Sequence, residues 1–482
     1  MANIPHEFEG WSTYPNSLSL LATETDPKGY DQRLAQAEKL LFLAEEDDEN
    51  VVEVLELGSP GEDGMRDAEY STIESTAELA SLCATSRSSW AFFLFQVTSW
   101  ESLQVSPEFL KKLFSFLRVR PEFLDVVFLF GAKAGPVEQS FSSFFSHCRP
   151  LPRESATADL RCSYDIGYNI KYAAAHGRSS PKDPFSIRET GLYHNFDAQT
   201  QQTQWIFLQA AEELQERVRQ YFTRSDESQE EAQVRLHGMV FQAASHGWRD
   251  YLVYLEDTFA KMVTRGFYSN VTGPRCEGAI EADFADIRQL QFMADKLEQL
   301  HQVLQRNIDV GQELCDFLER AQGLSPPRLL PAFQDTASII RYCLLQHRIH
   351  SSRLRSLISR ANGSGMLVQN ILNIRATDST AKINGRMREL AEKNARETRS
   401  MSIVSLISAI FLPAMFLATL FGTNFFDYEG GNMHIASNFW IYVVIAAGMS
   451  AFTVLLWVLY QRKRRLRSVH LQKDLEGEIE MQ

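Results

Sequence analysis

The sequence of 482 residues lacks the short motifs that mark common enzyme sites. It contains no glycine-rich phosphate-binding loop, no HExxH helix and no nucleophile elbow. These absences argue against an ATP-driven pump, and they predict that the protein is not an enzyme.

Cysteine is scarce, and its spacing forms no recognisable pair. No CxxC motif joins any two of the six cysteines, which are Cys83, Cys148, Cys162, Cys276, Cys315 and Cys343. Scattered cysteines of this kind predict reduced thiols in a cytosolic domain and no disulfide framework.

Targeting segments and a surplus of positive charge are also missing. The N-terminal stretch MANIPHEFEGWSTYPNSLSL has no basic start followed by an apolar run, and it is not rich in arginine. It therefore predicts neither a secretory signal nor a mitochondrial transit peptide, and the large N-terminal part is expected in the cytosol. The net charge of −13 argues against nucleic acid as a partner and is a weak indication of cation handling.

Two long uncharged stretches near the end of the chain, Ser400–Phe426 and Gly430–Gln461, are separated by a short acidic turn. About 20 apolar residues cross the hydrocarbon core of a bilayer as a helix. A central charge would cost about 2.5–3.5 kcal/mol on the insertion scale, and neither stretch has one at its centre. The sequence therefore predicts an integral membrane protein with spans at 400–426 and 438–460, joined by an external loop at 427–437.

Flanking charges predict the orientation of this hairpin. The loop has no Lys or Arg, whereas basic residues precede the first span and follow the second: Arg386, Arg388, Lys393, Arg396, Arg399, Arg462, Lys463, Arg464, Arg465 and Arg467. The positive-inside rule places both termini, including the basic tail at 461–482, in the cytosol. We expect the plasma membrane as the host, with a vacuolar or other internal membrane as the alternative.

The residues ahead of the spans predict an α/β domain followed by a helical stalk. Alternating or short apolar runs indicate strands at 51–57, 89–97, 125–131, 159–172 and 185–193, whereas 107–117 has the pattern of a helix capped by Ser106. We divide this part into an acidic N-terminal region at 1–80, an α/β domain at 81–275 and a helical stalk at 276–399. The expected fold is a mostly antiparallel or mixed sheet flanked by helices, then a long stalk helix and a two-helix transmembrane hairpin. The sequence NGSG at 362–365 predicts a kink or a gap in the stalk.

The first span has two different faces. At about 100° per residue, one side carries hydroxyls, thioethers and one leucine, and the opposite side is apolar. The first side consists of Met401, Ser405, Ser408, Leu412, Met415 and Thr419. Such a side can serve helix–helix packing through small residues, or it can line a pore, with Met401 and Leu412 as candidate constrictions.

The outer end of this span carries a second candidate site, Gly422, Thr423 and Asn424, followed by the loop acids Asp427 and Glu429. An amide oxygen accepts hydrogen bonds from the water shell of a cation. Because Mg²⁺ gives up its waters reluctantly, a ring of neutral acceptors suits it. The two acids can concentrate cations at the mouth, or they can be ordinary solvated loop residues. The sequence assigns no metal-ligating carboxylates.

The two C-terminal spans, the FLPA of the first span and the G-x-N tripeptide resemble the CorA-type divalent-cation transporter superfamily. The usual tripeptide of that family is Gly-Met-Asn, and Thr423 replaces the methionine here. The segments SWESLQVSPEFLKKLF, RPEFLDVVFLFG, SYDIGYNIKY and FSIRETGLYHNFD are similar to the fungal CorA-like branch. The resemblance covers most of the chain from about residue 80 to 465.

The resemblance implies a homopentamer in which each first span lines a central pore and the cytosolic domains form a funnel. Gly422, Thr423 and Asn424 then match the selectivity filter, and no resident cofactor is implied beyond a transported or regulatory divalent cation. Two departures, Thr423 and a loop without the usual Met-Pro-Glu-Leu sequence, leave Mg²⁺ and Zn²⁺ both open as the cargo. They also leave open an alternative function, a membrane-anchored regulatory or scaffold protein that does not transport.

Overall fold

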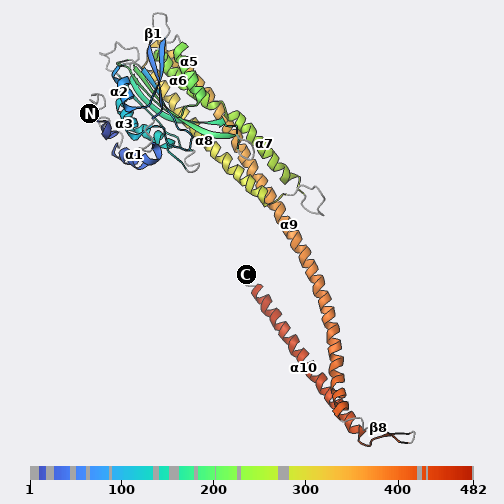
Figure 1. Ribbon diagram of the computed structural model, residues 1–482. Coiled ribbons are helices and arrows are strands. Elements are labelled where there is room, and N and C mark those ends of the chain that lie inside the picture. Colours follow the sequence, from blue (N-terminus) through green and yellow to red (C-terminus); the bar gives the residue numbers. More distant parts are fainter. Residues whose placement is uncertain are drawn as a thin grey trace. The chain divides into compact units, whose positions relative to one another are not determined.

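The computed structural model describes residues 10–17, 27–43, 50–60, 66–85, 89–133, 140–150, 162–177, 183–200, 202–224, 229–269, 282–420, 426–429 and 432–479. The chain forms two compact units, Met1–Leu372 and Asn373–Gln482 (Figure 1). We describe each unit by itself.

The first unit is built on a seven-stranded mixed sheet with strand order β2-β1-β3-β7-β6-β5-β4. Neighbouring strands are antiparallel except for the parallel pair β3 and β7. The strands are β1 (Val52–Pro60), β2 (Arg66–Ile73), β3 (Ser89–Leu94), β4 (Phe144–Pro150), β5 (Cys162–Ala175), β6 (Phe185–Asp197) and β7 (Gln202–Leu208). This arrangement confirms the expected fold class.

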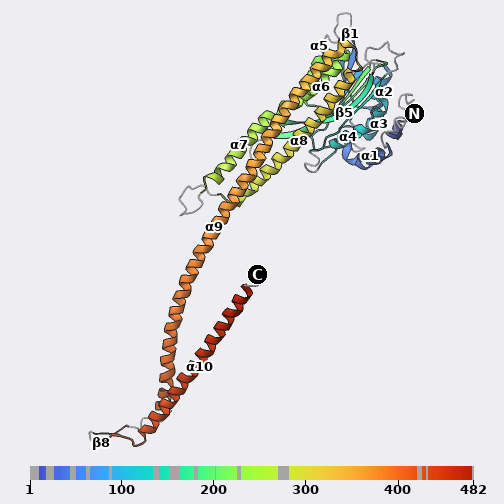
Figure 2. The same cartoon turned by 180° about the vertical axis from the view of Figure 1, so that it is seen from behind.

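Four short helices cover one face of the sheet (Figures 1 and 2). They are α1 (Pro27–Leu41), α2 (Thr76–Thr85), α3 (Pro107–Phe116) and α4 (Leu124–Val127). They form a core with the side chains of β1, β3 and β7 that point toward this face. Helix α3 begins where the sequence predicts it, because the Ser106 hydroxyl oxygen accepts a hydrogen bond from the Phe109 N–H at 3.2 Å.

Other helices, most of them longer, cover the opposite face (Figure 2). They are α5 (Glu212–Arg224), α6 (Gln229–Ser245), α7 (Trp248–Phe267), α8 (Phe284–Gln322) and α9 (Leu330–Leu420). Alternate residues of β5, among them Tyr164, Ile166 and Tyr168, point into this second core together with α6, α8 and α9. Because β5 is buried on both faces, its polar residues Asp165 and Asn169 must find partners inside the protein.

Helix α9 runs without a gap through 362–365, so the gap that the sequence offered as one possibility is wrong. Gly363 and Gly365 each cost about 1 kcal/mol of helix propensity relative to alanine. Leu354, Leu357 and Val368, which flank them on the same helix, are buried against α7 and α8, and this packing offsets the cost.

The predicted strand at 125–131 is also wrong. Residues Leu124–Val127 form α4, and Phe128–Phe130 form a 3-10 turn. Most side chains after Asp125 are buried, and the apolar run Val126–Phe130 gives no periodicity by which a strand can be told from a helix.

Two cysteines depart from the prediction of six reduced thiols. Cys148 on β4 and Cys162 on β5 are joined by a disulfide, with their Cα atoms 6.2 Å apart. The antiparallel register pairs Cys162 with Pro150 and Cys148 with Tyr164, which brings the two sulfurs to one face of the neighbouring strands. Cys315 and Cys343 are free and buried, Cys83 is also buried, and Cys276 lies outside the described residues.

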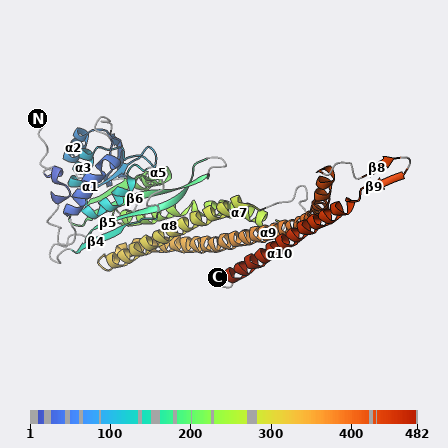
Figure 3. The ribbon, with the colours of Figure 1, turned by 90° about the horizontal axis from the view of Figure 1, so that it is seen from below.

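The second unit contains the end of α9, a short hairpin of β8 (Phe426–Glu429) and β9 (Asn432–Ile435), and α10 (Phe439–Ile479) (Figure 3). Two helical segments are long and apolar enough to cross a membrane, one within Pro327–Thr419 and the other at Phe439–Tyr460. Helix α10 continues beyond its apolar part, so the predicted tail at 461–482 is helical as far as Ile479.

Candidate functional site

The first span uses one narrow stripe of α9 to pack against α10. The residues in this stripe are half-buried or buried in the single chain, and they are Ser402, Leu406, Ala409, Pro413 and Leu417. Helix α10 presents a matching half-buried stripe with Tyr442, Ala446, Ser450, Val454 and Trp457. The Ser450 hydroxyl donates a hydrogen bond to the Ile410 carbonyl at 3.5 Å, which fixes the side of contact. The small residues Ser402 and Ala409 in the α9 stripe favour a close approach of the two helices.

The six residues predicted to line a path lie on another side of α9. Their common direction is about 120° around the helix from the α10 stripe, at 100° per residue. All six are exposed in the single chain: Met401, Ser405, Ser408, Leu412, Met415 and Thr419. The hairpin therefore leaves this face free for contact with lipid, water or another protein chain.

The hydroxyl of Thr419 is satisfied within its own helix. It lies 3.1 Å from the Met415 carbonyl oxygen and 2.8 Å from the Phe416 carbonyl oxygen, and it donates to them. A hydroxyl bonded in this way can face an apolar environment at little cost, and its oxygen can still accept from a water. Thr419 is therefore compatible with a wet or a dry surrounding.

The tripeptide Gly422, Thr423 and Asn424 lies outside the described residues. Asp427 and Glu429 belong to β8, whose backbone pairs Asp427 with His434 and Glu429 with Asn432 on β9. The loop between the spans is thus a strand hairpin in its described parts, and both acids are positions on one of its strands.

Metal-ligating side chains do not gather elsewhere in the described part of the chain. Across those residues, no group of three or more His, Cys, Asp or Glu side chains is placed to hold a metal ion.

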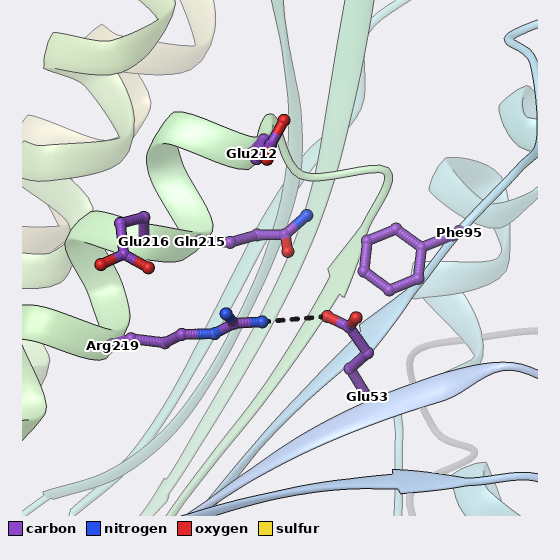
Figure 4. A pocket seen from close by; sticks show the side chains of 6 residues that line it. All are labelled: Glu53, Phe95, Glu212, Gln215, Glu216 and Arg219. Atoms are coloured by element: carbon purple, nitrogen blue, oxygen red, sulfur yellow. Dashed lines mark hydrogen bonds and ion pairs between the residues drawn. The ribbon is translucent and has the colours of Figure 1, made fainter.

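An acidic cleft of about 670 Å³ lies between β1, the end of β3 and α5 (Figure 4). Its carboxylates are Glu53, Glu212 and Glu216, and Figure 4 shows Arg219 reaching across to Glu53. The Arg219 guanidinium lies 3.3 Å from a Glu53 carboxylate oxygen and 3.8 Å from the centre of the Tyr70 ring. A cleft that holds its own cation beside a carboxylate is a poor site for a metal cation.

A chain of buried hydrogen bonds fixes α6 on the sheet. The Tyr168 hydroxyl lies 3.0 Å from His237 Nδ1, His237 Nε2 lies 3.0 Å from His194 Nδ1, and His194 Nε2 lies 2.9 Å from the Thr203 hydroxyl. Burial lowers the pKa of His237 to about 3, and it also lowers the pKa of His194, which has His237 beside it. Both rings are therefore neutral at physiological pH, and the chain is a structural element. Sequence spacing gave no sign of it, because its members come from three strands and a helix.

Comparisons with known proteins place this arrangement among membrane transporters. The family model described as CorA-like transporters matches residues 6–266, which is more than half of the chain. No curated protein sequence matches the chain.

Solved structures that are similar to the chain include the following three. The CorA magnesium transporter of Methanocaldococcus jannaschii is 13% identical with a TM-score of 0.33, and the match covers 84% of this chain and 97% of that one. The full-length CmaX protein is 13% identical with a TM-score of 0.34, covering 86% and 99%. The ZntB cytoplasmic domain of Vibrio parahaemolyticus RIMD 2210633 is 11% identical with a TM-score of 0.36, covering 69% and 99%.

Proposed function

Because the chain belongs to the CorA-like transporter family, we propose that it moves divalent metal cations across a membrane, with Mg²⁺ as the first candidate and Zn²⁺ as the second. Proteins of this family are membrane oligomers that bind divalent cations, and they are transporters and not enzymes. The prediction that the protein is not an enzyme is thereby confirmed. Together with its two apolar helices, this membership makes the chain an integral membrane protein.

The observation that carries the proposal is the uncharged side of the first span that α10 leaves uncovered. We propose that five copies turn this side toward a common axis, so that Ser405, Ser408 and Thr419 line a water-filled path. Met401 and Leu412 form its constrictions. A pore lined by hydroxyls and thioethers lets a hydrated cation pass without binding it tightly, as conduction requires.

The proposed filter is the tripeptide Gly422, Thr423 and Asn424 at the outer end of the path. A ring of Asn424 amide oxygens accepts hydrogen bonds from the waters of a hydrated ion, which suits Mg²⁺. Asp427 and Glu429 raise the local cation concentration at the mouth. A divalent cation that moves 100 mV toward the negative side gains about 4.6 kcal/mol, so the electrochemical gradient suffices to drive uptake.

For the cellular setting, we propose both termini in the cytosol, from the flanking Arg and Lys residues. The plasma membrane is the preferred location and a vacuolar or other internal membrane the second. The sequence segments named above favour the fungal branch of the family.

Liposome flux tests the function. Purified protein is reconstituted with a Mg²⁺-sensitive dye inside the vesicles, and a potassium gradient with valinomycin sets the potential. We expect wild-type uptake of Mg²⁺, and we expect Asn424→Ala to reduce the initial rate about tenfold or more. The reason is that a hydrogen bond to a charged group is worth about 1.5–3 kcal/mol, and 1.4 kcal/mol corresponds to a factor of ten.

Asn432→Ala is the matched control, because it makes the same substitution on β9 of the external hairpin and should leave the rate unchanged. Native mass spectrometry of the same preparation counts the subunits, and five are expected. A well-assembled oligomer that takes up none of Mg²⁺, Zn²⁺, Co²⁺ and Ni²⁺ would refute transport and favour the membrane-anchored regulatory or scaffold protein.

A further inference from the structure

The disulfide of the first unit lies at the edge of the seven-stranded sheet, where one of its two sulfurs can be reached from solvent. It joins Cys148 on the edge strand β4 to Cys162 on β5. Cys148 is an exposed residue, whereas Cys162 is fully buried. Exposed disulfides are the ones that exchange with thiols, and enclosed ones resist reduction. The position of Cys148 therefore opens this bond to attack from one side.

The orientation proposed above puts this disulfide in the cytosol, together with the rest of the N-terminal part of the chain. The cytosolic thiol pool keeps most cysteines reduced, and the disulfides that do form there are usually transient, catalytic or redox-sensing. A bond that is exposed on one side and surrounded by such a pool is expected to open and to close again.

The surroundings of Cys148 suit a negatively charged thiol. Ser146 and Cys148 are two positions apart on β4, so their side chains leave the same face of the sheet. On that face, the guanidinium of the exposed Arg320 on α8 lies 3.3 Å from the Ser146 hydroxyl oxygen. A cation beside a sulfur favours the thiolate form, and it also attracts an anionic reactant. The class of reductant that fits is therefore an anionic small-molecule thiol, of which glutathione is an example.

The disulfide holds a strand that has a partner strand on one side only. The ladder between β4 and β5 ends where Pro150 faces Cys162, so the disulfide lies at this end of the ladder. The same strand contacts α8 through Ser146 and Arg320, and Arg320 lies two residues before the end of α8 at Gln322. Opening the disulfide therefore loosens the end of β4 beside the last turn of α8.

We propose that Cys148 and Cys162 form a reversible thiol–disulfide exchange site for an anionic small-molecule thiol. The thiolate of one reductant molecule attacks the Cys148 sulfur and forms a mixed disulfide with it. The bond between Cys148 and Cys162 breaks, and its electron pair leaves on Cys162, which takes up a proton. A second reductant thiolate then attacks the reductant sulfur of the mixed disulfide, and Cys148 leaves and is protonated. The protein gains two electrons and two protons, and two reductant thiols become one disulfide; the reverse sequence closes the bond.

A redox titration of the full-length protein in detergent tests the exchange. The protein is equilibrated at increasing ratios of reduced to oxidised glutathione, quenched with acid and unfolded. Free thiols are then blocked with N-ethylmaleimide, and the remaining disulfides are reduced and labelled with iodoacetamide. By mass spectrometry, we expect Cys148 and Cys162 to change together from the iodoacetamide label to the maleimide label as the ratio rises. Cys315 and Cys343, which are free, should carry maleimide at every ratio.

Two variants separate the site from its surroundings. In Cys148→Ser, Cys162 has lost its partner and should carry maleimide at every ratio. Arg320→Gln should slow the reduction of the bond by glutathione about threefold or more, and it should leave the reduction by the uncharged 2-mercaptoethanol unchanged. Arg306→Gln is the matched control, because it makes the same substitution at an exposed position of α8 whose guanidinium pairs with Asp309, and both rates should equal those of wild type.

Thermal unfolding reports what the bond does for the fold. The two cysteines are 14 residues apart in sequence, and a disulfide that closes a loop of this length restricts the unfolded chain. The reduced wild-type protein should therefore unfold about 4 °C below the oxidised protein. Cys148→Ser should unfold at one temperature under both conditions.

Two results would overturn the proposal. One is that the pair stays as two thiols in oxidised glutathione alone. The other is that the pair stays bonded in the folded protein under a large excess of reduced glutathione, while the unfolded protein is reduced. None of these measurements depends on cation uptake, so a failure of the transport function in liposomes leaves the exchange site to its own test.

Discussion

Asn307 on α8 provides the bonds that β4 does not supply to β5, and its removal should destabilise the first unit strongly. The pairing of β4 with β5 ends where Phe144 faces Tyr168. The backbone of Lys171 therefore has no β4 residue opposite it. Asn307 is fully buried and takes the place of a strand there. Its side-chain oxygen accepts from the Lys171 N–H at 3.1 Å, and its amide donates to the Lys171 carbonyl at 2.7 Å.

Asn307→Ala leaves both backbone groups of Lys171 buried without these bonds. An unsatisfied buried group costs about 1–3 kcal/mol, so the pair amounts to about 2–6 kcal/mol. For a unit of 372 residues, such a loss lowers the apparent Tm by about 3–8 °C. The assay is thermal unfolding of the full-length protein in detergent, followed by circular dichroism.

Gln305→Ala is the control on the same helix, because Gln305 is exposed and its amide reaches only Asp309, at 3.4 Å. It should shift the Tm by less than about 1 °C, as surface substitutions do. If Asn307→Ala unfolds at the wild-type temperature, the reasoning that this amide replaces a strand is refuted.

Two further predictions concern the packing of the helices on the sheet. Burial lowers the pKa of His237 to about 3 from an ordinary value near 6.5, so below about pH 6.5 the unfolded chain binds more protons than the folded chain. The free energy of unfolding therefore decreases as the pH falls, by about 2 kcal/mol between pH 7.5 and 5. Thermal unfolding at these two pH values should show a smaller loss of stability in His237→Gln than in wild type. A Cβ added at Gly311 would lie 2.5 Å from a Leu344 methyl carbon and 2.8 Å from the Phe241 ring, whereas one added at Gly363 would meet nothing within 4 Å. Gly363→Ala should raise the Tm through a gain of up to about 1 kcal/mol in helix propensity, and Gly311→Ala should lower it; a rise in both would show that α8 and α9 are not this close.

Much of the sheet could be predicted because its strands alternate. The segment SYDIGYNIKY places Tyr164, Ile166 and Tyr168 at every second position, and these three residues point into one core. The same rule found β1 and β6. It failed at Asp125–Gly131, where the run that follows Asp125 has no polar position to reveal its period.

The disulfide and the histidine chain show what local patterns cannot reveal. Cys148 and Cys162 are 14 residues apart in sequence, and only the antiparallel register of β4 and β5 brings them together. His194 and His237 are 43 residues apart, and their contact depends on how α6 lies on the sheet. Both features depend on which elements become neighbours, and hydrophobic periodicity does not contain that information.

The candidate path could be predicted in part for the opposite reason, because a helix face is a local property. The side with Ser405, Ser408 and Thr419 follows from residue spacing, and the structure adds which side α10 occupies. Carboxylates that hold a metal between copies of the chain would come from different subunits. No spacing within one chain relates them, and the described residues of one copy contain no such group.

The division of α9 into three sides links the fold to the proposed function. Within the span, the stripe that contains Ser402 and Ala409 faces α10, and the bulky Ile407 and Phe411 are exposed on a side suited to lipid. A helix that served only as an anchor would need two sides, one for its partner and one for lipid. The third side is uncharged and bears hydroxyls inside the bilayer. Hydroxyls in a bilayer need protein or water partners, and a path along an axis shared by several copies, as proposed above, would supply water to this side.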